Sequence, residues 1–228
     1  MKRSQINQII KEAESFIEKF QFALPPFASW TPEEWDKKGR ECDEIRDNML
    51  GWDITDYGLG NFAETGLVLI TLRNGNQNNK NYDKPYAEKL IISREEQICP
   101  MHFHWKKMED IINRGGGILM MQLYNSAQTG ELAESDVTVV SDGVTLRVPA
   151  GAIVELTPGQ SITLTRGMYH AFWAKKGTGE VLIGEVSQCN DDNTDNRFHE
   201  PMGRFPQIEE DAEPYRLLCN EYPTRPAK

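Results

Sequence analysis

The sequence has little of what membrane-spanning, signal-bearing and nucleic-acid-binding chains need. No apolar run approaches about eighteen residues, and Met1-Lys2-Arg3-Ser4 leads into a polar helical pattern without an apolar signal region. The 35 acidic residues outnumber the 25 basic ones, and the net charge of −10 disfavours binding to nucleic-acid phosphates. We therefore expect a cytoplasmic protein with no membrane and no nucleic-acid partner.

Cysteine is also scarce. The four copies, Cys42, Cys99, Cys189 and Cys219, are scattered without CxxC spacing. This distribution argues against a disulfide framework or a zinc ribbon and indicates reduced thiols. We expect Cys99, which lies close to two histidines, to be a buried structural thiol, because free cysteine is so often buried.

Two helices are expected near the N-terminus. Apolar residues recur every three or four positions between residues 4 and 20, which predicts an amphipathic helix capped by Ser4. Thr31-Pro32-Glu33-Glu34 has the residues of a capping box, so a second helix is expected from there through Glu44 or slightly beyond. Both helices are expected to pack against the rest of the chain.

From Gly66 onward the hydrophobic pattern changes to that of short strands separated by turns. Ser141-Asp142-Gly143 is a tight hairpin signal. The candidate strands are 66–73, 89–98, 116–124, 137–140, 144–148, 153–156, 161–165, 169–174 and 181–187. So many short strands predict a mainly β sandwich or closed barrel.

At 228 residues the chain fits one structural domain. We expect N-terminal helices over 1–65 that pack on a barrel formed by 66–190. The proline-containing tail over 191–228 is expected to wrap the barrel as an irregular strap.

Three of the four histidines fall in two short segments. In an extended strand His102 and His104 project to the same face, while Phe103 points the opposite way. Together with Glu109 and His170 they suit a catalytic divalent ion such as Mn, Fe, Co, Ni or Zn, with positions left open for substrate. The alternative, unrelated solvated or core histidines near a glutamate, is disfavoured by this clustering.

Such a site supports two kinds of chemistry. The ion can polarise a carbonyl and stabilise a developing enediolate, or bind dioxygen if it is iron or copper. Proton transfer needs another group nearby. Lys89 starts the strand that leads toward the histidines, Glu109 itself can carry a proton, and Asp191 and Asp192 follow the last strand. Lys89 is equally well read as an edge lysine in solvent.

Four further residues are candidates for contact with substrate. Trp105 and Trp173 flank the predicted ligands and could form an apolar wall for a sugar ring, although core packing is the usual role of tryptophan. Glu200 and Arg204 lie in the strap and would approach the barrel mouth if the strap closed over it, although surface positions are commoner for such residues.

The spacing from His102 to Gly116, HxH, four residues, Glu, six residues, Gly, resembles the first cupin motif, and the segment around His170 resembles the second. Thr165 and Ala174 stand where the second motif usually has proline and asparagine, and neither is a ligand. More specifically, the chain resembles the D-lyxose isomerase family over essentially its whole length. The segments that carry this likeness are 99–117, 184–187 and 190–198.

The resemblance implies a mainly β cupin barrel, or jelly roll, with N-terminal helical decoration, acting as a homodimer. It implies an Mn²⁺-dependent isomerase, with Co²⁺, Zn²⁺ or Fe²⁺ as possible replacements. The substrates would be D-lyxose and D-xylulose, with D-mannose and D-fructose as a second pair. Carried onto this sequence, the metal ligands are His102, His104, Glu109 and His170. The catalytic or substrate-contact candidates are Lys89, Glu109 and Asp192.

Three alternatives remain at this point. The same ligand set serves an iron-dependent cupin dioxygenase, and a non-catalytic sugar-binding cupin is a second possibility. The third, an isomerase of a phosphorylated hexose, needs a cationic pocket, for which the available residues are Arg94, Arg147, Arg166 and Arg197.

Overall fold

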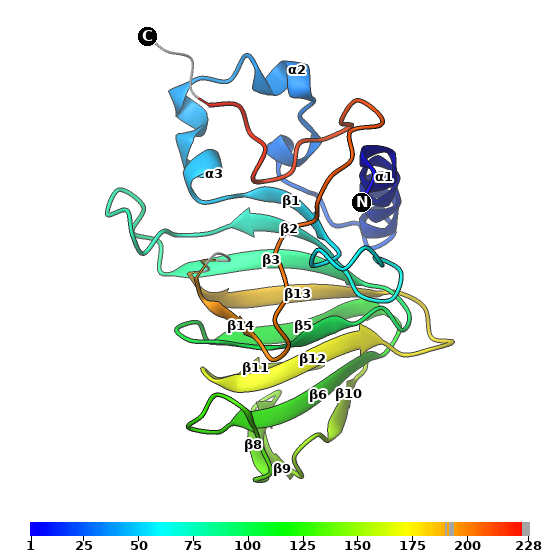
Figure 1. The fold of residues 1–228 in the computed structure, drawn as a ribbon, viewed down its shortest axis with the longest axis vertical. Helices are drawn as coiled ribbons and strands as arrows, with labels where there is room; N and C mark the ends of the chain where they lie inside the picture. Colours follow the sequence, from blue (N-terminus) through cyan, green and yellow to red (C-terminus); the bar gives the residue numbers. More distant parts are fainter. Residues whose placement is uncertain (190, 192–193, 225–228) are drawn as a thin grey trace.

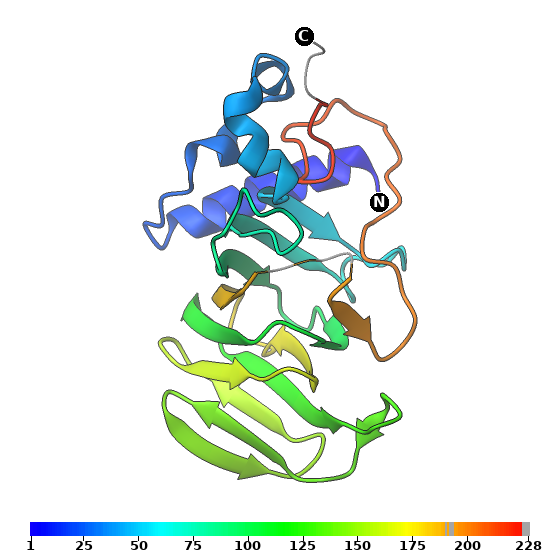
Figure 2. The same ribbon diagram turned by 90° about the vertical axis from the view of Figure 1, so that its left-hand side faces the viewer.

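A computed structural model describes residues 1–189, 191 and 194–224, and these residues form two antiparallel sheets that curl toward each other (Figures 1 and 2). The eight-stranded sheet has the spatial order β1 (Gly51–Thr55), β2 (Leu67–Arg73), β3 (Tyr86–Ser93), β13 (Val181–Gln188), β5 (Glu109–Gly116), β11 (Ser161–Leu164), β8 (Val137–Ser141) and β9 (Val144–Val148). The six-stranded sheet has the order β10 (Ile153–Leu156), β6 (Leu119–Ser126), β12 (Met168–Ala174), β4 (Cys99–His104) and β14 (Asn196–Phe198), with β7 (Leu132–Ala133) beside β6. The mainly β prediction is confirmed.

The space between the two sheets is an apolar core. Alternate residues of each strand point into it, as the period of two requires. The side chains that fill it include Leu69, Ile91, Ile111, Leu119, Met121, Leu123, Val139, Ile162 and Ile183. This packed interior supports the polar residues at the mouth of the barrel.

A second apolar core lies on the outer face of the eight-stranded sheet, beneath α1 (Arg3–Glu18). Ile6, Ile9, Ile10, Ala13 and Ile17 of α1 are buried together with sheet residues Val68, Ile70, Leu90, Ile92 and Leu182. The figures show α1 beside the β1, β2 and β3 end of the sheet. The amphipathic helix is therefore confirmed as a packing element.

The cap predicted for α1 was wrong. Lys2 occupies the N-cap position, and Ser4 lies within the first turn. Ser4 instead donates from its backbone N–H and its hydroxyl to the carboxylate of Asp211, at 2.9 and 2.8 Å. The start of the helix is set by the C-terminal segment, where the Arg3 N–H donates to the carbonyl of Glu209 at 2.9 Å.

The second predicted helix is interrupted. Its capping box at Thr31 is present, but α2 (Pro32–Trp35) is only one turn long. Gly39 then adopts an extended conformation, and the chain continues as the 3-10 turn η2 (Arg40–Cys42) and α3 (Asp43–Asp47). Glycine weakens a helix interior, so the predicted continuous helix to Glu44 does not form.

The strand predictions differ from the structure in three places. Strand β1 (Gly51–Thr55) was missed, because it lies in the part of the chain expected to be helical. The expected strand over 89–98 runs instead from Tyr86 to Ser93, and Glu96, with φ of 57°, turns the chain toward β4. Strand β5 was missed, because its inward positions include the polar residues Glu109 and Asn113. An alternation of apolar and polar residues is hard to recognise when polar side chains occupy the buried face.

The C-terminal segment crosses the barrel mouth and then returns to α1 (Figure 1). It was expected to be irregular, yet it contains β14, which pairs with β4 so that Asn196 lies opposite His104 and Phe198 opposite His102. Farther along, Glu210 and Glu221 form ion pairs with the buried Arg3 at 2.7 and 2.5 Å. Among the described helices, none has the length and apolar character needed to cross a membrane.

Candidate metal centre

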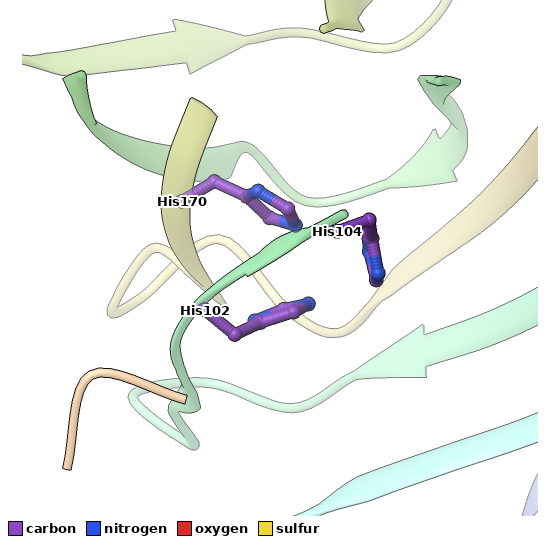
Figure 3. Close-up of side chains that lie close together, drawn as sticks. All are labelled: His102, His104 and His170. Atoms are coloured by element: carbon purple, nitrogen blue, oxygen red, sulfur yellow. The ribbon is translucent and has the colours of Figure 1, made fainter. Parts of the chain in front are cut away.

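The three predicted histidine ligands come together in the structure. His102 and His104 lie on β4, and His170 lies directly opposite His102 on β12. Their rings point toward one another (Figure 3), and one nitrogen from each can be chosen so that the three lie within 4.8 Å of one another. All three side chains are buried. Two neighbouring antiparallel strands thus build half of a coordination shell.

Backbone contacts orient two of the rings for metal binding. The Nδ1 atom of His102 lies 2.7 Å from the carbonyl oxygen of Pro100, and that of His170 lies 3.1 Å from the carbonyl oxygen of Met168. A ring that donates from Nδ1 to a carbonyl keeps its Nε2 lone pair for a ligand. Burial lowers the pKa of His102 well below its ordinary value, and burial also lowers that of His104. These shifts favour the neutral form of His102 and His104, which is the form that binds a metal.

Glu109 reaches the histidines from the opposite sheet. Its Oε1 atom lies 3.2 Å from Nε2 of both His104 and His170. Metal–ligand bonds of about 2.0–2.2 Å place adjacent ligands of an octahedral ion about 3 Å apart, close to this spacing. The three imidazoles and the carboxylate therefore fit a divalent ion.

The sequence analysis missed two charged residues beside Glu109. The Nζ atom of Lys107, which is only 2% exposed, lies 2.7 Å from Glu109 Oε2 and 2.7 Å from Glu185 Oε1. Burial alone would lower the pKa of Lys107, but the two carboxylates raise it above its ordinary value. In turn, although burial opposes ionisation, Lys107 and the nearby histidines hold the pKa of Glu109 well below its usual range.

Of these two residues, only Glu185 could have been identified from the sequence pattern. Glu185 is the only charged residue of β13, and it lies buried on the same face as the core residues Val181 and Ile183. A charge at such a position needs a buried partner. Lys107, in the turn between β4 and β5, left no pattern of its own, because only the fold brings it under Glu185.

The other acid–base candidates have different positions. Lys89 lies on β3 opposite Glu185, with its Nζ atom 3.7 Å from Glu185 Oε1, and it is buried rather than solvated at an edge. Asp192 lies outside the residues that the structure describes. Glu109 lies between the histidines and Lys107.

The histidines line a narrow cavity of about 40 Å³. The charged residues Lys89, Lys107, Glu109 and Glu185 line the cavity beside the histidines. Tyr57, Asn196, Phe198 and Arg204 complete the lining. Phe198 stacks obliquely on His102, with 5.6 Å between the ring centres. The strap thus supplies part of the wall.

Three of the four predicted substrate contacts do not line this cavity. Trp105 points away from the histidines, packs on Phe103 and is 56% exposed. Trp173 lies on the outward face of β12, because His170 and Phe172 occupy the alternate inward positions. Glu200 is exposed beside His199. Only Arg204 lies in the wall, where its guanidinium is 2.5 Å from the carboxylate of the buried Asp53.

The arginines proposed for a phosphate pocket also lie elsewhere. Arg94 pairs with Glu12 of α1, Arg147 pairs with Asp136, Arg166 contacts Gln188, and Arg197 lies near Gly130. None of the four lines the cavity at the histidines.

Cys99 also lines the cavity but is not suited to bind metal. Its Sγ atom lies 3.2 Å from the hydroxyl of Tyr57, and burial raises the pKa of its thiol to about 12. Metal coordination requires the thiolate. Cys99 therefore agrees with the expected buried structural thiol.

Comparisons with known proteins agree with this site. The family model for D-lyxose isomerase matches residues 1–222. A D-lyxose/D-mannose isomerase of Serratia proteamaculans is 51% identical, and one of Escherichia coli O157:H7 is 48% identical; each alignment covers 97% of this chain and 98% of the relative.

Among solved structures, an L-ribose isomerase of Cellulomonas parahominis with L-psicose matches with a TM-score of 0.60 at 16% identity. The match covers 92% of this chain and 98% of the other, and at this identity it supports the fold alone. The sequence matches and the assembled histidines lead to one conclusion: this chain belongs to the D-lyxose isomerase family.

Proposed function

We propose that this chain is an aldose–ketose isomerase that interconverts D-lyxose with D-xylulose and D-mannose with D-fructose. Two relatives of about half identical sequence bear the name D-lyxose/D-mannose isomerase and match over nearly their full length. The buried histidine cluster supports the metal-dependent chemistry that this reaction uses.

The observation that carries the proposal is the position of Glu185. Its carboxylate lies in the same cavity as the histidines and Glu109, and it is held by Lys107 at 2.7 Å and Lys89 at 3.7 Å. An isomerase needs a base that is not itself a metal ligand, so that it can take a proton from carbon. Glu185 meets this requirement and replaces Glu109 and Asp192 as our candidate base.

The remaining residues divide into two groups. His102, His104, Glu109 and His170 would hold the ion, which we propose to be Mn²⁺ on the resemblance to the D-lyxose isomerase family; imidazole and carboxylate ligands are compatible with that ion. When bound, such an ion polarises a neighbouring carbonyl and stabilises negative charge on oxygen. Lys107 and Lys89 position Glu185 through ion pairs at 2.7 and 3.7 Å.

In this proposal Glu185 removes the proton from C2 of the open-chain aldose and returns it to C1. Because one carboxylate acts on one face of the sugar, the intermediate is a cis-enediol. In the first half, the electron pair of the C2–H bond forms the C1–C2 double bond, and the π electrons of the C1 carbonyl move to its oxygen, which gains a proton. In the second half, the O2 hydroxyl loses its proton to form the C2 carbonyl, and the electrons of the C1–C2 double bond take up the proton from Glu185 at C1. Lys107, within hydrogen-bond distance of Glu185, is the nearest side-chain donor to this step.

An anaerobic assay of Mn²⁺-loaded protein with free and phosphorylated aldoses tests the function. We expect turnover of D-lyxose and D-mannose, little turnover of phosphorylated sugars, and no turnover after chelation of the metal. Oxygen consumption without isomerisation would support the iron dioxygenase instead, and binding without turnover would support a sugar-binding cupin. Running the reaction in deuterated water tests the route: an enediol incorporates solvent deuterium at carbon, and a hydride shift does not.

We also propose that the chain is a homodimer of single-domain subunits in the cytoplasm. The two apolar cores share the eight-stranded sheet, which supports one cooperative unit over 1–65, 66–190 and 191–228. Light scattering coupled to size-exclusion chromatography measures the mass in solution, and a single unfolding transition would support the single domain.

A further inference from the structure

Arg204 lies in the cavity wall, apart from the charged cluster around Glu185, and it pairs with Asp53 behind the wall. Asp53 lies on β1, and Glu185 lies on β13, three strands away in the order β1-β2-β3-β13. At about 4.8 Å between neighbouring strands, β1 and β13 lie about 14 Å apart across the curved sheet. Asp53 also lies two residues along β1 from Gly51, which is the position in register with Glu185. Arg204 pairs with Asp53 through two contacts, 2.5 and 3.4 Å long, and lines the same cavity as His102.

The position of Arg204 is fixed by its backbone as well as by its side chain. The hydroxyl of Thr55 donates to the carbonyl of Arg204 at 2.7 Å, and the N–H of Gly203 donates to the carbonyl of Tyr57 at 3.1 Å. The same Thr55 oxygen accepts a hydrogen bond from the N–H of Tyr57 at 2.9 Å. The strap is thereby fastened to the end of β1 at the point where Arg204 enters the cavity.

Stability alone is a weak reason for a buried ion pair at this place. The side chains of Arg204 and Asp53 are only 12% and 3% exposed, and removing two charges from water costs much of what their attraction returns. Apolar neighbours such as Leu69, which pairs with Asp53 across β1 and β2, show that an apolar pair would fit the surroundings. The pair does offer a guanidinium donor and a carboxylate acceptor together, which is what a sugar hydroxyl requires.

We propose that Arg204 and Asp53 form the distal subsite that binds the terminal hydroxyl of the open-chain sugar. This inference rests on the proposed function, which places C1 and C2 at Glu185. The carbon chain then extends past Lys89 and Leu69 toward β1. A hexose has one more carbon than a pentose, so its terminal hydroxyl reaches the pair. The subsite therefore determines how well the protein accepts D-mannose relative to D-lyxose.

Kinetics of the Arg204→Met and Arg204→Lys variants with both sugars test the inference. A lost hydrogen bond to a charged group is worth about 10- to 100-fold in affinity, so we expect KM for D-mannose to rise by at least about tenfold in Arg204→Met. KM for D-lyxose should rise by a smaller factor than KM for D-mannose, because the shorter sugar lacks the terminal carbon that reaches the pair. Arg204→Lys keeps the charge but loses the forked geometry, and it should give an intermediate KM.

Arg216→Met is the matched control. Arg216 also lies in the C-terminal segment, is 13% exposed and pairs with a carboxylate, Glu14, at 3.2 Å, but it does not line the cavity. We expect it to leave both KM values unchanged. Equal changes for the two sugars in Arg204→Met, or a change confined to kcat, would overturn the subsite.

Calorimetry with two polyols gives a second readout that does not depend on turnover or on every variant folding. D-mannitol and D-arabinitol are the reduced forms of the two aldoses. We expect the wild-type protein to bind D-mannitol more tightly and Arg204→Lys to show a smaller difference between the two polyols. Equal binding of both polyols by the wild type would refute the subsite, whereas absence of isomerisation by the wild type would refute the proposed function.

Discussion

Over much of β2, β3 and β13 both faces of the eight-stranded sheet are buried, but they are buried in different ways. On β3, Leu90 and Ile92 point outward and lie beneath α1, whereas Lys89 and Ile91 point inward. On β13, Leu182 lies beneath α1, and Glu185 lies among charged partners at the mouth of the barrel. The outer face therefore stabilises the fold by apolar burial. The inner face also buries charged side chains, which require oppositely charged partners.

This difference separates residues that determine activity from residues that determine stability. A change on the inner face at the mouth should alter turnover or metal content. A change on the outer face beneath α1 should alter the free energy of unfolding and leave the kinetics intact. Four substitutions test the separation, from the largest expected effect to the smallest.

Glu185→Gln should lower kcat by about 10²- to 10⁴-fold, because the amide cannot accept the proton from carbon. Bound metal and melting temperature are the accompanying measurements, and we expect the metal to remain. Glu88→Gln is the control: it makes the same change on β3, where Glu88 pairs with Arg73 on the outside. Turnover by Glu185→Gln close to that of the wild type would exclude Glu185 as the base.

Lys107→Met should destabilise the protein by about 3–5 kcal/mol, because two buried carboxylates lose their shared cation. It should also change the pH dependence of metal binding. Lys107 lowers the pKa of Glu109, so its removal raises that pKa, and Glu109 takes up a proton at a higher pH than in the wild type. Metal should therefore dissociate at a higher pH during acid titration. An unchanged titration would show that Lys107 does not control Glu109.

Ile10→Ala should lower the free energy of unfolding by about 2–5 kcal/mol, because Ile10 is fully buried between α1 and the sheet. Denaturant unfolding measures this loss. At a temperature well below the transition we expect kcat and KM to match the wild type. A fall in kcat in the folded variant would show that the outer core influences the site and would remove the distinction between the two faces.

Lys175→Ala should have the smallest effect. Lys175 pairs with Glu155 at 2.8 Å, but the two side chains are 41% and 45% exposed. Such pairs contribute less than about 1 kcal/mol. Both unfolding and turnover should stay near the wild-type values. A larger loss of stability would mean that exposed charges matter more in this fold than burial predicts.

The sequence predicted the histidine strand because its signal is local. His102 and His104 share a face through the period of two, and Glu109 follows at a fixed spacing. The amphipathic α1 was predicted for a similar reason, since its stripe of apolar residues is contained in one helix.

The residues that were missed depend on contacts between distant strands. Glu185 meets Lys107 only because β13 lies between β3 and β5, and Asp53 meets Arg204 across 151 positions of the chain. Pairings of this kind follow from sheet order and register, which no local pattern contains. Strand β5 escaped recognition because its inward positions Glu109 and Asn113 are polar.

The origin of the cavity wall has a consequence for how the protein is synthesised. All four candidate ligands lie at or before residue 170, whereas the described strap residues in the wall, Asn196, Phe198 and Arg204, follow at least twenty-six positions later. The candidate ligand residues are therefore synthesised before the strap residues that line the cavity. A chain that lacked the strap would keep every candidate ligand but lose Asn196, Phe198 and Arg204 from the wall, so an ion would meet fewer side chains on its way to the histidines.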